Sequence, residues 1–269
     1  MEFTFGIISN LNTSVYLEEV IESVRSQKIE NYEILIVGDQ LDKYSSWDTV
    51  IINFDDKSKK PWISKKKNLI TQNAKYENIV YLHDYIKLDE NWYKGYVNFN
   101  KEFKVCINPI INKDGSRYRD WTLFYKNNTR FDKFLVDTGS CLLPYTESRL
   151  SKYMYISGAY WVAKKDFMAK NPLDNNRFWG DSEDVEWSFR VRKQTNFVIN
   201  TQSTVSLLKY KDPLFKLIDY KDLDDFINYV SSYRAFVDRI KLRIKKISNT
   251  ILTKSGLNFR YNYFDINKF

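Results

Sequence analysis

The chain has 269 residues, of which 43% are hydrophobic and 17% aromatic, so it is able to bury a substantial core and does not have the composition of a disordered protein. No run reaches the roughly 18 apolar residues of a membrane span, and the N-terminus lacks the basic and apolar regions of a signal peptide, so we expect a cytoplasmic protein. The net charge of +8 is concentrated in residues 233–254, which carry seven basic residues against one acid, and this uneven distribution argues against a nucleic-acid binder.

The first elements predict a parallel α/β sheet. Residues 3–7 alternate large apolar side chains with small or polar residues, as a strand does. Residues 17–24 then place apolar side chains at i, i+3, i+4 and i+7, which is one face of a helix, and the apolar run at 33–37 ends in a polar turn at Asp39. A strand, a helix and a strand within about 40 residues are typical of the start of a parallel sheet.

The same pattern repeats in a strand at residues 50–52, a helix at 63–74 and a buried strand at 78–84. Ligands in open α/β sheets gather at the carboxyl ends of the strands. We therefore expect Ser9, Asp39 and Asp84, each at such an end, to converge on one crevice.

The second half of the chain is less regular. Residues 112–151 are polar, aromatic and irregular, which predicts an ordered covering segment. Ordered, strand-like segments are expected at residues 104–108, 154–163, 197–199 and 205–208. The composition then changes to helical patterns, so we predict an α/β domain over residues 1–215 and a helical, basic amphipathic extension over residues 216–269.

An unusual group of acids lies between Phe178 and Trp187, where Asp181, Glu183 and Asp184 surround a Trp-Gly turn just before a helical pattern. A core disfavours such a group, because buried carboxylates are costly unless they are paired or used. At a helix start, however, the exposed N–H groups and the helix dipole hold a carboxylate ionised and oriented. The segment therefore predicts either a chemical site or an ordinary acidic N-cap.

Two sets of motifs carry a resemblance to family 2 glycosyltransferases of the GT-A fold, over roughly residues 3–210. The opening strand, the helix with Ser23–Gln27 and the second strand ending in Asp39 resemble the nucleotide-binding half of that family. The resemblance to the acceptor half of the family rests on Ser157-Gly158, Trp179-Gly180 and Glu183-Asp184. The resemblance implies a GT-A-like, Rossmann-related α/β/α sandwich with a mostly parallel mixed sheet.

The resemblance also implies an inverting glycosyltransferase, which moves a sugar from a nucleotide-sugar donor to a hydroxyl of a polysaccharide, glycan or lipid-linked oligosaccharide. Asp184 is then the general base on the acceptor hydroxyl, and Glu183 binds the acceptor or orients its neighbour. Gly158, Trp161 and Trp179 are expected on the acceptor side, because flat aromatic rings stack on sugars. Core packing is the alternative for each aromatic residue.

On the donor side, the resemblance places Asp39 against the uracil or ribose, with a turn-capping Asp as the alternative. Lys67 and Asn68 are expected near the diphosphate, together with Ser9 and Asp84, although three consecutive lysines also suit a solvated helix start.

The chain departs from the family at His83-Asp84-Tyr85, where the family has Asp-x-Asp. Asp84, with His83 as a further ligand, predicts a site for Mn²⁺ or Mg²⁺ that has few ligands from the protein. The runner-up is a metal-independent enzyme, in which Lys67 and Lys209 neutralise the leaving diphosphate.

Two alternative functions stay open. A nucleotidyltransferase shares the fold class, but residues 9–13 lack the glycine and the cation expected after its first strand. A non-catalytic carbohydrate-binding protein keeps the aromatic residues and loses the metal site.

The basic helix at residues 233–254 predicts either peripheral contact with an anionic membrane or a solvent-facing surface.

Overall fold

The computed structural model describes residues 1–9, 14–55, 62–125, 139–232 and 240. The chain divides into two compact units, residues 1–217 and 218–269. In the second unit, α6 (Tyr220–Ser231) begins at an Asp219 side chain that accepts the Asp222 N–H. Apart from Ile240, the basic segment 233–254 lies outside the described residues.

The first unit is built on a seven-stranded sheet in the order β12-β6-β11-β4-β1-β2-β3. Its strands are β1 (Phe3–Ile8), β2 (Tyr32–Gly38), β3 (Thr49–Asn53), β4 (Asn78–His83), β6 (Val105–Ile107), β11 (Tyr160–Lys164) and β12 (Phe197–Ile199). Strand β11 runs antiparallel to β4 and β6, and all other neighbours are parallel. The predicted α/β class with a mostly parallel mixed sheet is therefore confirmed.

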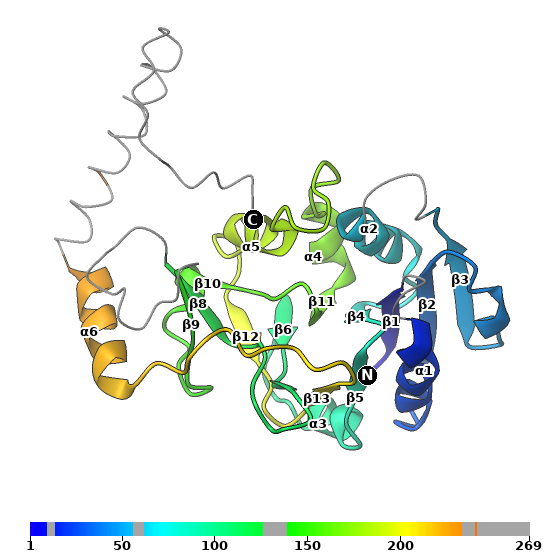
Figure 1. Cartoon of the computed structure of the whole chain (residues 1–269), viewed down its shortest axis with the longest axis horizontal. Coiled ribbons are helices and arrows are strands. Elements are labelled where there is room, and N and C mark those ends of the chain that lie inside the picture. Colours follow the sequence, from blue (N-terminus) through cyan, green and yellow to red (C-terminus); the bar gives the residue numbers. More distant parts are fainter. Residues whose placement is uncertain (10–13, 56–61, 126–138, 233–239, 241–269) are drawn as a thin grey trace, which may run out of the picture. The chain divides into compact units, whose positions relative to one another are not determined.

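Helices cover both faces of this sheet. They are α1 (Leu17–Arg25), α2 (Ile63–Asn73), α3 (Trp92–Val97), α4 (Lys165–Lys170) and α5 (Glu183–Val191). Figure 1 shows α2, α4 and α5 on one side and α1 and α3 on the other. The indole of Trp92 anchors α3, with its ring 5.1 Å from Phe3 and 5.5 Å from Phe5. Within the described ranges, no helix is both long and apolar enough to cross a membrane.

Two smaller sheets complete the unit. One contains β5 (Ile86–Leu88), β13 (Val205–Leu207) and β7 (Ile110–Ile111), and the other β10 (Met154–Tyr155), β8 (Thr122–Phe124) and β9 (Ser140–Leu142). Part of the segment expected to be irregular thus forms antiparallel strands. The ordered stretch at residues 154–163 contains two strands of different sheets, β10 and β11, and the turn between them carries Gly158.

Gly6 allows α2 to lie directly on β1. A Cβ at Gly6 would come within 2.2 Å of the Ile70 side chain, so any larger residue would push the helix away. Lys67 is one turn before Ile70 on the same side of α2, and both are buried. The small residue in β1 therefore brings a lysine of α2 down to the sheet.

Candidate active site

The carboxyl ends of β1 and β4 bring two polar side chains together. Ser9 Oγ donates a hydrogen bond of 2.6 Å to Asp84 Oδ2, and the Asp84 N–H donates to the Ile8 carbonyl. Asp84 is buried, whereas Asp39, which follows β2 at the same edge of the sheet, is half-buried. The predicted meeting of strand ends is thus observed for Ser9 and Asp84. Asp39 follows β2, which lies on the other side of β1 from β4.

The acids at the start of α5 are turned toward the connection between β10 and β11. Ser182 precedes them with a φ of 53°, an uncommon conformation for a residue with a side chain. Asp184 Oδ2 accepts the Gly158 N–H at 2.7 Å, and Asp184 Oδ1 accepts the Val185 N–H at 2.8 Å. Because a carboxylate offers about four lone-pair sites, Asp184 is fixed in orientation and is still able to accept a proton.

Lys67 lies beneath this acidic pair. Its Nζ donates to the Gly158 carbonyl at 2.7 Å, is 4.0 Å from Glu183 Oε1 and lies 4.4 Å from the centre of the Trp161 ring. Burial lowers the pKa of Lys67, and the charges of Glu183 and Asp184 act in the opposite direction. The Lys67 ammonium is thus buried between the acids and His83, whose pKa its charge also lowers, and a contact with the donor diphosphate stays a prediction.

Glu183 is the most strongly perturbed acid of the site. Its side chain is buried, and this burial, followed by the Asp184 charge, raises the pKa of Glu183 to about 7, against the effect of Lys67. At neutral pH the Glu183 carboxyl group is thus divided between its two protonation states, so it is able to donate a hydrogen bond as well as accept one.

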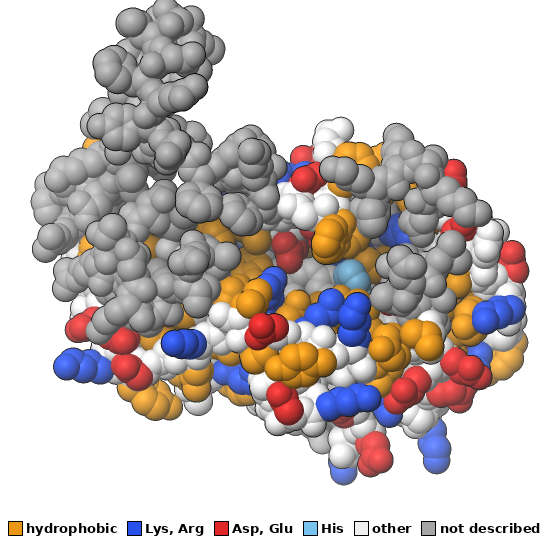
Figure 2. All heavy atoms as spheres, viewed as in Figure 1, with side chains coloured by type: hydrophobic (Ala, Val, Ile, Leu, Met, Phe, Trp, Pro, Cys, Tyr) orange, Lys and Arg blue, Asp and Glu red, His pale blue; other side chains and the backbone are white. Residues whose placement is uncertain are grey.

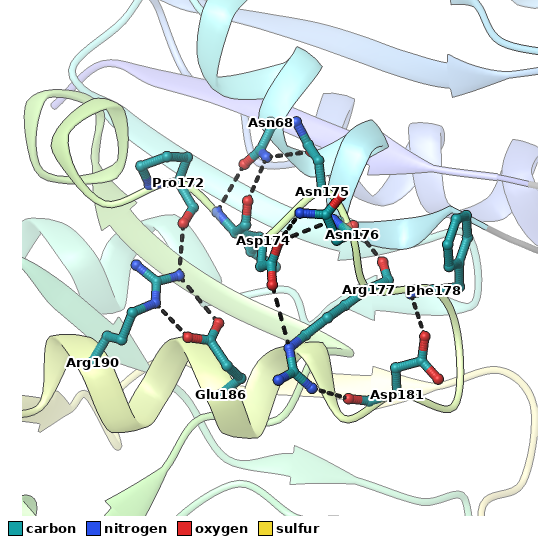
Figure 3. A network of polar contacts seen from close by, with 12 residues as sticks. Asn68, Pro172, Asp174, Asn175, Asn176, Arg177, Phe178, Asp181, Glu186 and Arg190 are labelled. Atoms are coloured by element: carbon teal, nitrogen blue, oxygen red, sulfur yellow. Dashed lines mark hydrogen bonds and ion pairs between the residues drawn. The ribbon is translucent and has the colours of Figure 1, made fainter. Parts of the chain in front are cut away.

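The segment before α5 is fastened to α2 by the polar contacts drawn in Figure 3. Asn68 Nδ2 donates to the Leu173 carbonyl and to Asn175 Oδ1, each at 2.8 Å, and Asn68 Oδ1 accepts the Leu173 N–H at 3.0 Å. Ser64 Oγ donates to the Arg177 carbonyl at 2.7 Å. The amide of Asn68 therefore holds this segment, and a contact of Asn68 with the donor stays a prediction.

The two tryptophans expected on the acceptor side have different environments. Trp161 is 1% exposed, with its ring 4.7 Å from Tyr81 and 5.5 Å from Trp187. The structure therefore corrects its assignment, because a ring enclosed in the core has no face for a sugar. Trp179 is 68% exposed and keeps its ring accessible.

The residues beside Asp84 offer few metal ligands. Burial lowers the pKa of His83 well below its usual value, and the charges of Lys67 and Lys211 lower it further. Across the described ranges, no three His, Cys, Asp or Glu side chains form a group that would hold a metal ion. Mg²⁺ is usually held by one or two carboxylates together with substrate phosphates and water, so Asp84 alone would hold such an ion only with the donor diphosphate bound. Mn²⁺ or Mg²⁺ at Asp84 stays a prediction from the resemblance.

Two cations without a sequence signal, Arg119 and Lys211, lie near Tyr85, the residue that follows Asp84. The charges of Arg119, Lys209 and Asp84 all act on Lys211, and the Lys211 Nζ lies 4.7 Å from the centre of the Tyr85 ring. Arg119 was not predictable, because nothing in the neighbouring residues marks the left-handed φ of 42° that it adopts.

Comparison with solved structures identifies the fold. Searches of family models and of curated proteins gave no match. The structure of residues 1–349 of S. aureus TarS superposes with a TM-score of 0.52 at 13% identity, covering 77% of this chain and 60% of that one. GalNAc-T7 with UDP, GalNAc and Mn²⁺ superposes with a TM-score of 0.54 at 15% identity, covering 80% of this chain and 45% of that one. Both neighbours are GT-A proteins.

The chain has the GT-A fold. It spans about 60% of the length of the TarS 1–349 chain, which has also been solved with UDP-GlcNAc and with UDP. Within this GT-A fold, the strand ends with Ser9 and Asp84 and the helix start with Glu183 and Asp184 are the two polar sides of one candidate active site.

Proposed function

We propose that this protein is an inverting glycosyltransferase, which moves a sugar from a nucleotide-sugar donor to a saccharide hydroxyl. The observation that carries the proposal is the fixed carboxylate of Asp184, held by the Gly158 N–H at 2.7 Å beside a buried Glu183 and Lys67. The GT-A neighbours add support for the donor class, since TarS has been solved with UDP-GlcNAc and GalNAc-T7 with UDP and GalNAc.

In the proposed reaction, Asp184 takes the proton of the acceptor hydroxyl while that oxygen attacks the anomeric carbon of the donor sugar. A new bond forms between the acceptor oxygen and the anomeric carbon. The bond between that carbon and the diphosphate oxygen breaks on the opposite face, and the nucleoside diphosphate leaves with the bonding electrons. Attack from the opposite face inverts the configuration of the anomeric carbon.

The other residues of the site position the two substrates. Asp39, half-buried at the end of β2, is placed to accept hydrogen bonds from the nucleoside, and Ser9 with Asp84 forms the floor beside it. Glu183 supports Asp184 and the acceptor hydroxyl, and the exposed ring of Trp179 is available to the acceptor sugar.

Asp184→Asn tests the assignment of the base. The amide keeps the size of the side chain but is unable to accept the hydroxyl proton, so we expect sugar transfer to fall by roughly 10²- to 10⁴-fold. Affinity for UDP should stay within a few fold, because the change lies on the acceptor side. Transfer and binding are measured by product formation from UDP-sugars and by calorimetry.

Glu186→Gln is the matched control on the same helix. Glu186 pairs with Arg190 at 2.6 Å and lies outside the polar site, so its loss should leave transfer nearly unchanged. Undiminished transfer by the Asp184→Asn protein would contradict the assignment of Asp184 as base.

A further inference from the structure

Arg119, Lys209 and Lys211 are cations that the proposed proton transfer does not use. Within the described part of the chain, none of them forms an ion pair with an acid. The three lie close enough for Lys209 and Arg119 to lower the pKa of Lys211, after the effect of its burial, and Asp84 acts in the opposite direction. Figure 2 shows lysine and arginine side chains beside the histidine on the face drawn.

Arg119 is held in a costly conformation. Its φ of 42° lies in the left-handed region, which a residue with a long side chain rarely adopts. Its guanidinium is 5.5 Å from the centre of the Tyr118 ring and 5.0 Å from that of Phe215. In the described structure its Nε is buried without a hydrogen-bond partner, while the guanidinium also hydrogen-bonds the Tyr155 side chain. A strained backbone and an unused N–H of the guanidinium together indicate a place for an anionic ligand.

The backbone of Lys211 is held by the side chain of Asn112. Its N–H donates to Asn112 Oδ1 at 3.0 Å, and its carbonyl accepts Asn112 Nδ2 at 2.8 Å. Its ammonium lies over the ring of Tyr85, the residue that follows Asp84 at the end of β4. The backbone that carries Lys211 is thus anchored, and its charge is directed to the edge of the sheet where Ser9 and Asp84 meet.

We propose that Arg119 and Lys211, with Lys209 at the rim, bind the diphosphate of the donor and neutralise the charge that it gains on leaving. This assignment rests on the proposed function, because the ligand is the leaving group of that reaction. A guanidinium offers a planar pair of N–H donors that matches two phosphate oxygens, and an ammonium adds a point charge. Cations fixed before the reaction stabilise developing negative charge without reorganisation.

The geometry favours the donor diphosphate over an anion on the acceptor. The Lys211 Nζ lies 4.7 Å from the centre of the Tyr85 ring, and Tyr85 directly follows Asp84, which is hydrogen-bonded to Ser9 at the donor edge of the sheet. Glu183 and Asp184 occupy the acceptor side, where their charges would repel a second anion.

Inorganic pyrophosphate in the presence of EDTA is the direct probe of this site. We expect calorimetry to show binding to the wild-type protein, and Arg119→Gln and Lys211→Gln each to weaken it about tenfold or more. Lys94→Gln, at an exposed lysine of α3, should bind as the wild type does. Lys211→Gln keeps the test valid if the change at Arg119 disturbs folding, which thermal melts of each variant report.

Two results would overturn the assignment: affinities of both variants within twofold of the wild type, or binding of pyrophosphate only after Mn²⁺ or Mg²⁺ is added. Failure of the proposed function has a different signature. In that case pyrophosphate binds as expected, but none of UDP, GDP, CDP and dTDP binds more tightly than pyrophosphate does, and the anion site stands without a nucleotide site.

Discussion

Gly158 is the residue on which the charges of the site converge. A Cβ at this position would lie 3.1 Å from Glu183 Oε1, 3.2 Å from Asp184 Oδ2 and 3.3 Å from Lys67 Nζ. These separations are shorter than ordinary contacts, so Gly158→Ala would move the charged groups by a few tenths of an ångström. We expect transfer to fall roughly tenfold, because catalysis is sensitive to such displacements, and stability to fall by about 1–3 kcal/mol.

Nucleotide affinity is the internal control for Gly158→Ala. The change lies between the acids and Lys67, so UDP binding measured by calorimetry should be nearly unchanged. A variant with wild-type transfer rates would show that the close approach at Gly158 has no role in positioning Asp184.

Glu183 gives the stability of the protein a defined pH dependence. Its pKa is raised to about 7 from 4.5, so between these values the folded protein keeps a proton that the unfolded chain has lost. The contribution of Glu183 to stability therefore falls as pH rises from about 4.5 to 7 and is constant above that range. Glu183→Gln removes this effect, so its stability relative to the wild type should increase with pH, by on the order of 2 kcal/mol between pH 5 and pH 8.

Urea unfolding at several pH values measures this difference. Glu186→Gln, on the same helix and paired with the partly exposed Arg190, serves as the control for loss of a carboxylate outside the site. A constant difference between Glu183→Gln and the wild type from pH 5 to pH 8 would contradict the raised pKa.

At the scale of elements, α2 holds the start of α5 in place. Trp62, just before α2, donates from Nε1 to the Asn175 carbonyl at 2.7 Å, and Arg177 donates to the Asp181 carbonyl at 2.8 Å. Asp181 Oδ2 in turn accepts the Phe178 N–H, and Figure 3 shows this contact with the others of the network. The position of Asp184 therefore depends on contacts that lie outside the site.

Asn68→Ala tests this dependence. The change leaves the Leu173 N–H and carbonyl without their buried partner, so we expect a loss of stability of about 1–3 kcal/mol and slower transfer at unchanged UDP affinity. Asn73→Ala, at an exposed position of the same helix, is the matched control and should be nearly neutral. Loss of UDP affinity without loss of stability would instead support a donor contact by Asn68.

The elements were predictable because their signals are local. Alternation in β1 and the apolar run of β4 identify the sheet, and the topology of parallel strands brings Ser9 to Asp84. The burial of Lys67 was not predictable, because a run of lysines is typical of a solvated surface and the burial depends on the contact between Gly6 and Ile70. Such a contact between distant elements leaves no pattern in the segment itself.

The environment of a side chain that suits both a core and a binding site was also not predictable. An indole is equally suited to a core and to a sugar, so only the structure distinguishes the buried Trp161 from the exposed Trp179. Arg119 depends on a backbone conformation that its neighbours do not encode, and its role emerges from the rings and cations around it.

At the scale of the whole molecule, a ligand that binds only the folded protein must raise its melting temperature. At a concentration of 100 times Kd the added stability is about 2.7 kcal/mol, which for a chain of this size corresponds to a rise of roughly 5–10 °C. We expect this rise with UDP or another nucleoside diphosphate, measured by thermal melts with EDTA present. Uridine, which lacks the diphosphate, should give a much smaller rise, because it does not reach Arg119 and Lys211. No rise with any of UDP, GDP, CDP and dTDP, with or without Mn²⁺, would favour a non-catalytic carbohydrate-binding protein on the GT-A fold.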